Sequence, residues 1–311
     1  MMLEKDDKSG KHIMRIDASL YKESDCEQFV RYKLIEGLVA GGVPSTNDEA
    51  PTKDAAMEYG TAFHKGLQAR AEGKDINEQL KIVTTHFSQP GIFFKPKEWR
   101  NIGHLVSTYV GYDSAYKQFD QLVPIVRDGK VLVEQRFMFP FYKTEKTEVL
   151  LCGTIDMIAT IHGMTVIVDH KTTGAWDVDE YMNEYILSPQ LMIYKWVYDR
   201  LHNTDAGCVI NGVFIGGKKP AVFRRSDIIM FSPEQVGNCI AHVTARVKRT
   251  VESFESGEPV IPNYTQCVKK YGDKAKPCQF MLLCQQRTAG DREFALSNYG
   301  AKVYNPMEWQ T

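Results

Sequence analysis

The strongest pattern in the chain is a pair of apolar, β-branched runs on either side of His162 and Gly163. Two such runs around a two-residue loop with glycine are typical of a β-hairpin. Counting outward from this loop places Asp156 directly opposite Asp169. Lys171 shares their face of the sheet, because side chains alternate along a strand.

Two opposed carboxylates are unfavourable in a sheet built only for stability. Cβ atoms of directly opposed residues lie roughly 4.5–5.5 Å apart, and like charges at that distance repel each other. A divalent cation between the carboxylates, with a lysine beside them, would remove this repulsion. A solvated strand face that carries charges is the alternative, but the lysine in phase and the long apolar runs favour a metal site.

The remaining hydrophobic pattern predicts helices before the hairpin and a mixture of strands and helices after it. Apolar residues at helical spacing indicate helices over about 24–37, 54–72, 75–90 and 99–119. Strands are expected from Val131 onward and over 207–216 and 221–231, with helices starting at Ser188-Pro189 and Ser232-Pro233. The order predicts an α/β fold with a central mixed β-sheet flanked by helices.

Two residues of the helix expected at 54–72 could belong to the same site. Gly60 and His64 lie one turn apart on one face. A glycine inside a helix costs about 0.5–1 kcal/mol relative to alanine, so a close ligand or backbone would explain its presence. The alternative is easier helix packing beside an ordinary, partly buried histidine.

Three other polar residues have two interpretations each. Gln190 lies in the first turn of the helix that starts at Ser188, where free N–H groups suit an anion such as phosphate, and Tyr194 follows one turn later. Alternatively, Gln190 faces water and Tyr194 only packs. Glu134 either faces the carboxylates or pairs with Arg136.

Composition excludes some classes of protein. The chain has 311 residues, of which 43% are hydrophobic, enough for a sizeable core. No apolar run is long enough to cross a membrane, and the N-terminus lacks an apolar signal core, so we expect a cytoplasmic protein that makes no membrane contact. The net charge of −1 argues against a globally basic nucleic-acid binder, although residues 211–276 hold 11 Lys/Arg against 6 Asp/Glu.

The seven cysteines are unevenly distributed. Cys267, Cys278 and Cys284 fall within one short segment, where about 0.4 would be expected by chance. In a cytosolic chain such a group favours metal binding or plain burial over disulfides. Cys152, Cys208 and Cys239 lie in elements expected to be buried and are interpreted as core residues.

Taken in order, these motifs resemble those of the PD-(D/E)xK nuclease superfamily. The motifs are Gly60-x3-His64, Gly153-x2-Asp156, Asp169-x-Lys171 and Gln190-x3-Tyr194, with one early cysteine and three late ones. The chain looks most like the RecB-like branch, which includes CRISPR-adaptation nucleases, helicase-nuclease subunits and phage-type exonucleases. The second acid is aspartate here, where glutamate is commoner.

The resemblance implies a restriction-endonuclease-like core and a role for each motif. His64, Asp156, Asp169 and the backbone carbonyl of His170 would bind Mg²⁺ or Mn²⁺. Lys171 would orient or activate the attacking water, and Asp156, Asp169 and Lys171 would form the catalytic set. Gln190 and Tyr194, with Glu134 as a further candidate, would support the site and the nucleic-acid backbone.

The cysteines resemble those of the family's iron–sulfur members. Cys26, Cys267, Cys278 and Cys284 would hold a [4Fe–4S] cluster that joins the N- and C-terminal segments. Ten residues separate Cys267 from Cys278, where many members have two, so zinc remains an alternative.

The implied domain covers residues 18–290. It has a helical part to about 125, a sheet core over about 130–257 and a cysteine-rich segment over 258–290. Residues 1–17 are expected to form a mobile tail and residues 291–311 a C-terminal tail.

The expected function is metal-dependent hydrolysis of DNA, by an exonuclease on single strands or duplex ends rather than by a sequence-specific endonuclease. Recombination proteins or single-strand-binding proteins would fit as partners. If a phage encodes the chain, the protein is expected in the cytoplasm of the bacterial host. The alternative is a non-catalytic nucleic-acid-binding or scaffold protein on the same fold.

Overall fold

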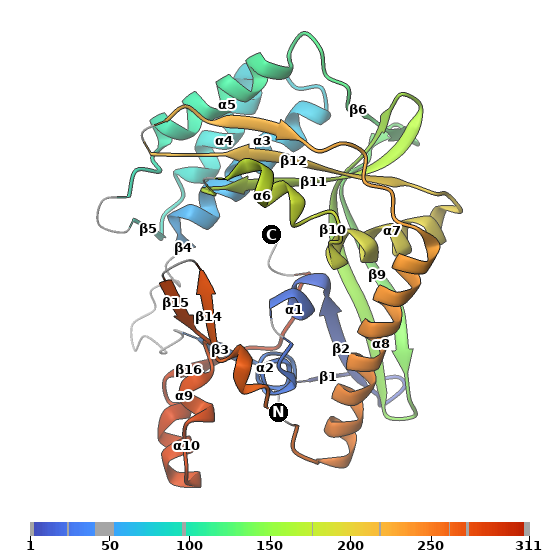
Figure 1. Ribbon diagram of the computed structural model, residues 1–311, viewed down its shortest axis with the longest axis vertical. Helices are drawn as coiled ribbons and strands as arrows, with labels where there is room; N and C mark the ends of the chain where they lie inside the picture. The colour runs from blue at the N-terminus through green and yellow to red at the C-terminus, as the bar shows by residue number, and fades with distance from the viewer. Residues whose placement is uncertain are drawn as a thin grey trace. The chain divides into compact units, whose positions relative to one another are not determined.

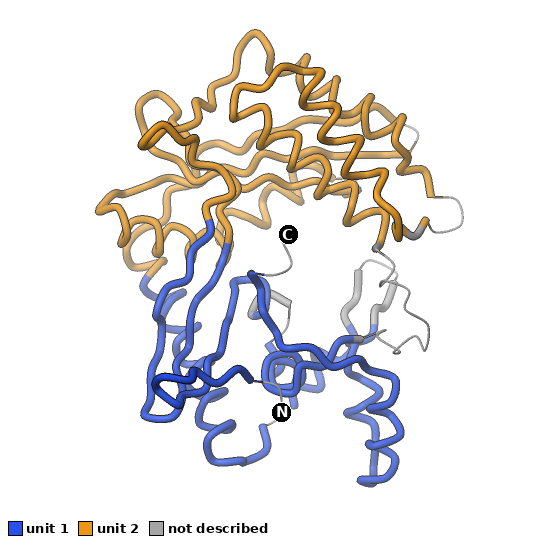
Figure 2. The backbone as a smooth tube through the Cα atoms, turned by 180° about the vertical axis from the view of Figure 1, so that it is seen from behind, with its two compact units in different colours: residues 1–49, 136–153, 237–311 blue, residues 50–135, 154–236 orange. Residues whose placement is uncertain are grey.

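The chain forms two compact units that interleave along the sequence, shown in different colours in Figure 2. The computed structural model describes residues 3–23, 25–40, 53–94, 98–175, 177–217, 219–260, 262–271 and 274–307. The first unit takes residues 1–49, 136–153 and 237–311, and the second takes 50–135 and 154–236. The domain predicted over residues 18–290 includes segments of both units.

The second unit contains the predicted hairpin and the helices around it (Figure 1). Its helices are α3 (Ala55–Ala71), α4 (Ile76–Phe87), α5 (Ile102–Tyr116), α6 (Val178–Asn183) and α7 (Pro189–His202). Its strands are β4 (Lys53–Asp54), β5 (Ile92–Phe93), β6 (Val123–Pro124), β7 (Val126–Arg127), β8 (Lys130–Val131), β11 (Met164–Thr173), β12 (Gly207–Phe214) and β13 (Val222–Arg225). Three elements cross from one unit to the other: β9 (Val133–Lys143), β10 (Thr147–Ile161) and α8 (Pro233–Ser256).

The sheet of the second unit is mixed, as predicted. Strand β10 pairs antiparallel with β11, β11 pairs parallel with β12, and β12 pairs antiparallel with β13. The predicted hairpin register is confirmed from Ile161↔Met164 to Met157↔Val168. His162 and Gly163 both have a positive φ, 50° and 82°, which is the backbone of a tight hairpin turn of type I′.

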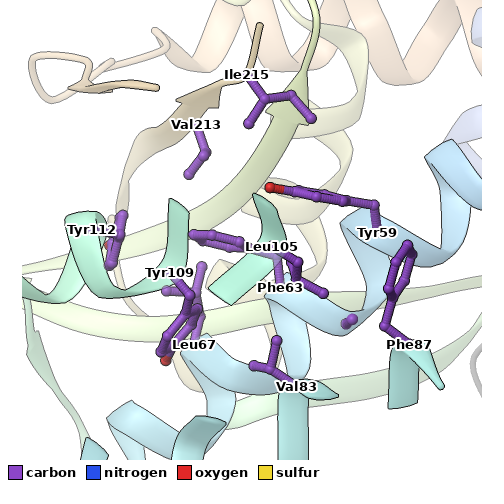
Figure 3. Packing of buried hydrophobic residues seen from close by; sticks show 11 residues of the cluster. Tyr59, Phe63, Leu67, Val83, Phe87, Leu105, Tyr109, Tyr112, Val213 and Ile215 are labelled. Carbon is purple, nitrogen blue, oxygen red and sulfur yellow. The ribbon is translucent and has the colours of Figure 1, made fainter. Parts of the chain in front are cut away.

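Helices cover both faces of this sheet. On one face, α3, α4 and α5 bury a cluster that includes Tyr59, Phe63, Tyr109 and, from β12, Val213 (Figure 3). Gly66 allows helix α3 to pack closely against its neighbours, because a Cβ there would lie 2.6 Å from Val83 Cγ2. Because side chains alternate along β12, Phe214 points to the other face, where α6 packs.

The first unit contains the segments that the sequence analysis treated as tails. Residues His12–Asp17 form β2, which runs parallel to residues 147–152 of β10, and β2 pairs with β1 (Glu4–Lys5). At the other end, α10 (Ala289–Leu296) precedes β16 (Tyr299–Ala301), which pairs with β3 (Leu38–Ala40). The expectation of a mobile tail over 1–17 and of a C-terminal tail from 291 is therefore wrong for these strands. Strand β2 pairs with β10, and β16 pairs with β3, each far away in the sequence. No local pattern therefore indicated that these segments form strands.

The remaining elements of the first unit are short, except for its part of α8. They are α1 (Ala18–Glu23), α2 (Glu27–Val30), a π-helical turn (Arg31–Ile35), a 3-10 turn (Tyr264–Gln266), β14 (Val268–Tyr271), β15 (Lys274–Pro277) and α9 (Met281–Cys284). The buried Phe280 lies at the centre of a cluster with Phe29, Tyr32 and Leu283. This apolar cluster packs the N-terminal and C-terminal segments of the chain against each other, whereas the metal cluster expected to join them stays a prediction.

Candidate functional site

Asp156 and Asp169 lie next to each other where the paired part of the hairpin ends. They follow Met157↔Val168, the last pair of the ladder, and alternation puts both on the face opposite to those two residues. The backbone N–H of His170 donates a hydrogen bond of 2.6 Å to Asp156 Oδ2. Burial and the neighbouring Asp169 raise the pKa of Asp156, although His64 and Lys171 act in the opposite direction.

Lys171 is the cation of this group. Its Nζ lies 2.6 Å from Asp169 Oδ2 and 3.5 Å from Gln190 Oε1. Burial alone would lower the pKa of Lys171, but Asp169 and Asp156 outweigh burial and raise it. The ammonium group is therefore held charged beside the two carboxylates.

His64 reaches the carboxylates from helix α3. Its Nδ1 lies 4.0 Å from Asp156 Oδ2, and its ring packs edge-on against His170, with the centroids 5.8 Å apart. A Cβ at Gly60 would meet only Thr172 Cβ at 4.0 Å, an ordinary contact. Close packing therefore does not require glycine at this position, although the helix does lie beside β11 as the site needs.

Gln190 and Tyr194 connect helix α7 to Lys171. The helix begins as predicted, with Ser188 as N-cap accepting from Leu191 N–H and Pro189 in the first turn. Gln190 Nε2 donates to the Tyr194 hydroxyl at 3.1 Å, while its Oε1 faces Lys171. Gln190 thus contacts the lysine, a contact that neither of its two interpretations from the sequence included.

Glu134 lies at the start of β9 with a φ of 46°, a left-handed conformation that is uncommon for a residue with a side chain. Its position in the site, or beside Arg136, stays a prediction.

Two sets of residues around the site were not found from the sequence. Tyr181 and Tyr185, one turn apart at α6, lie beside Lys171, whose Nζ is 5.9 Å from the centre of the Tyr185 ring. Their spacing of one helical turn is visible in the sequence, but the spacing does not indicate that the two side chains face the site.

The second set is a buried polar network behind His170. The amide of Asn211 lies 2.9 Å from His170 Nδ1 and donates to the Tyr112 hydroxyl at 2.8 Å. Arg225 bonds to Asn211, to Tyr112 and, at 2.5 Å, to Asp120. Burial, followed by the charges of His64 and Arg225, lowers the pKa of His170 well below its usual range, so its ring is neutral.

This network changes the interpretation of the basic segment 211–276. Arg225 was counted there as a possible phosphate contact, but its half-buried guanidinium is paired with Asp120. Lys218 lies outside the described residues.

The four predicted cysteine ligands come together in the first unit. Cys26 is buried in the cluster around Phe280, with Cys278 and Cys284 packed against it. Backbone N–H of Cys278 donates to the carbonyl of Cys267 at 2.7 Å. Burial raises the pKa of the Cys284 thiol, and the other three cysteines raise it further although Tyr32 lowers it.

Cys152 and Cys208 are fully buried, as predicted for core residues, whereas Cys239 is half-buried.

The site around Asp156 and Asp169 and the group of four clustered cysteines both contain side chains that suit a metal ion. Within the described ranges, no three His, Cys, Asp or Glu side chains are spaced as they stand to ligate one ion. However, Asp169 Oδ2 is buried and accepts no hydrogen bond of normal geometry, its close contact with Lys171 being an ion pair. Two adjacent carboxylates, the buried Asp169 and the half-buried Asp156, with an imidazole at their edge suit a hard divalent cation, and four clustered thiols suit iron or zinc.

Comparison with known families identifies the chain. The family model of the PD-(D/E)XK nuclease superfamily matches residues 30–285. The chain belongs to this superfamily. The predicted family and the predicted mixed α/β fold are therefore confirmed, and the family's nucleases generally use divalent metals. The narrower RecB-like iron–sulfur branch stays a prediction.

Two of the solved structures that resemble the chain are distant likenesses. A protein from Eubacterium rectale described as a "putative exonuclease" has 15% sequence identity and a TM-score of 0.44, over 80% of this chain and 84% of that protein. A protein named SSO0001 has 14% identity and a TM-score of 0.27, over 66% of this chain and 79% of that protein. No match was found among curated proteins. Over the described part of the chain, no helix has both the length and the apolar character needed to span a membrane.

Proposed function

We propose that the chain is a divalent-metal-dependent deoxyribonuclease whose active site is formed by His64, Asp156, Asp169 and Lys171. The observation that carries the proposal is the convergence of the buried Asp169 and the half-buried Asp156 with a charged lysine and a histidine at the end of one hairpin. Membership of a nuclease superfamily supports the same reaction class. Structural roles alone would not explain a buried carboxylate directly beside a half-buried one.

The proposed roles follow from the positions of the side chains. Asp156, Asp169, His64 and the carbonyl of His170 would hold Mg²⁺ or Mn²⁺. A bound cation of this kind neutralises the phosphodiester and lowers the pKa of the attacking water.

Lys171 supplies positive charge where negative charge develops on the phosphate in the transition state. Gln190 keeps the lysine in place through its 3.5 Å contact, and the hydroxyl of Tyr194 fixes the amide of Gln190 from the other side. The neutral ring of His170, held by Asn211, keeps the strand in register behind the site.

We further propose that the substrate is a DNA end or single strand, so that the enzyme is an exonuclease. This part rests on the resemblance of the ordered motifs to the exonuclease branch of the family. An endonuclease remains the other outcome of the test below.

The test is digestion of DNA labelled at the 5′ or the 3′ end, single-stranded and duplex, with Mg²⁺ or Mn²⁺. We expect the wild type to release mononucleotides or short products from one end. Asp169→Asn keeps the shape of the side chain but removes its charge, and we expect activity to fall at least about 100-fold, the loss typical of removing one transition-state-stabilising group. Cleavage of closed circular DNA would indicate an endonuclease.

Asp227→Ala is the matched control, because it removes an exposed carboxylate from the same unit. It should cleave like the wild type. If Asp169→Asn, Asp227→Ala and the wild type are all equally inert while DNA binding persists, the enzyme assignment fails and the chain is a binding protein on this fold.

We also propose that Cys26, Cys267, Cys278 and Cys284 hold a [4Fe–4S] cluster with a structural role. Three other cysteines gather around Cys284. Burial raises the pKa of the Cys284 and Cys267 thiols, and neighbouring cysteines raise it further, so a bound metal that stabilises the thiolates would fit this arrangement. Four cysteine thiolates also suit zinc, so the metal content of the purified protein decides between the two.

A further inference from the structure

Tyr181 and Tyr185 form a hydrogen-bonded pair beside the lysine of the active site. The Tyr185 hydroxyl donates to the Tyr181 hydroxyl at 2.9 Å, and the two rings pack with their centroids 5.4 Å apart. Tyr181 also packs edge-on against Phe214 of β12, at 5.5 Å. Both rings are therefore held in place from more than one side.

The two tyrosines differ in exposure and in contact with Lys171. Tyr185 is 3% exposed, and its ring lies 5.9 Å from Lys171 Nζ, near the outer limit for a cation–π contact. Tyr181 is only half-buried, so it is the outer member of the pair. The inner tyrosine contacts the lysine, and the outer one reaches the solvent side of the site.

The hydrogen bond between them determines what Tyr181 can do. A phenol has one proton to donate and can accept from other donors. Because the Tyr181 oxygen already accepts from Tyr185, its own proton is available to another acceptor, and Tyr181 lies near enough to Lys171 to interact with its charge. An anion attracted by Lys171 would find this hydroxyl as a second donor.

We propose that the Tyr181 hydroxyl donates a hydrogen bond to a non-bridging phosphate oxygen of the DNA held at Lys171, and that Tyr185 is the positioning residue that orients it. This inference rests on the proposed nuclease function and adds a substrate contact to it. The contact exists in both the bound substrate and the transition state, so it contributes to binding rather than to the chemical step.

The test is steady-state kinetics of Tyr181→Phe, which keeps the ring and removes only the hydroxyl. We expect KM for DNA to rise about tenfold with kcat nearly unchanged, the loss expected for one hydrogen bond to a charged group made equally in both states. Tyr185→Phe should raise KM less, because the donor remains but loses the bond that orients it. Unfolding curves of both variants should overlay that of the wild type.

Tyr116→Phe is the matched control, since Tyr116 is a half-buried tyrosine of the same unit that packs under Arg225 instead. Its KM should equal that of the wild type. If Tyr181→Phe also has the KM of the wild type while Asp169→Asn is inactive, the nuclease assignment holds and the role of Tyr181 is refuted. If the wild type is no more active than Asp169→Asn, the nuclease assignment fails and the role of Tyr181 fails with it.

Discussion

Two glycines in helix α3 should respond in opposite ways to the same substitution. A Cβ at Gly66 would collide with Tyr109 Cε2 and would lie 2.6 Å from Val83 Cγ2 and 2.8 Å from Tyr109 Cζ. Neither neighbour can retreat easily. Both are fully buried, and the Tyr109 hydroxyl donates to Gln79 Oε1 at 2.9 Å. At Gly60, in contrast, a Cβ would only touch Thr172 at 4.0 Å.

The expected free energies follow from two competing effects. Replacing glycine by alanine inside a helix stabilises it by about 1 kcal/mol. Overpacking a rigid core costs about 1–3 kcal/mol, and the contacts at Gly66 favour the upper end. We therefore expect Gly66→Ala to lower the free energy of unfolding by about 2 kcal/mol and Gly60→Ala to raise it by about 1 kcal/mol.

Urea unfolding, followed by circular dichroism and fluorescence, measures both variants against the wild type. Equal midpoints for Gly66→Ala and the wild type would refute the packing argument. Gly60→Ala has a second readout because it lies one turn from His64. If this variant is as stable as expected but cleaves DNA poorly, a ligand and not helix packing explains the glycine.

Two further predictions concern a buried lysine and the cysteines. Lys195 Nζ is bonded to Asp199, Asp205 and the Ala206 carbonyl, at 2.5–2.9 Å. Because both aspartates remain in contact with water, Lys195→Met should lower stability by about 1–3 kcal/mol, the cost of losing a buried hydrogen-bonded charge. Burial alone would lower the pKa of Lys195, but the two aspartates raise it above its ordinary 10.5. The difference in free energy of unfolding between the wild type and Lys195→Met should therefore be largest below about pH 10.5. It should shrink as pH rises through the raised pKa of Lys195, and a difference that stays constant with pH would contradict the ion pairs. Protein purified without oxygen should be brown and contain iron that Cys278→Ala loses, whereas Cys239→Ala should keep it; zinc without iron would overturn the cluster assignment.

The parts of the fold that were predicted correctly depend on local geometry. The turn at His162-Gly163 determines the hairpin register, because its two left-handed residues allow only one pairing of the strands. The start of α7 was equally local, since the Ser188 side chain and Pro189 act within one turn. The order of the motifs was also enough to indicate the nuclease superfamily.

The parts that were missed depend on contacts between distant segments. Strand β2 looked like part of a polar tail because its partner, the first half of β10, lies far along the chain. Arg225 looked like a surface cation, but Asp120 and Tyr112 accept hydrogen bonds from it. The sequence alone does not show whether a charged side chain is surrounded by water or paired with a carboxylate.

The sequence by itself determined that two carboxylates and a lysine share one face of a hairpin, because strand periodicity and turn length are local properties. Only the tertiary structure decided what surrounds them. It brings His64 from α3 to Asp156, places Tyr185 beside Lys171 and gathers Cys26 with three cysteines from the other end of the chain. These contacts arise from packing between elements, which depends on the shape of the whole core and leaves no periodic signal in any one segment.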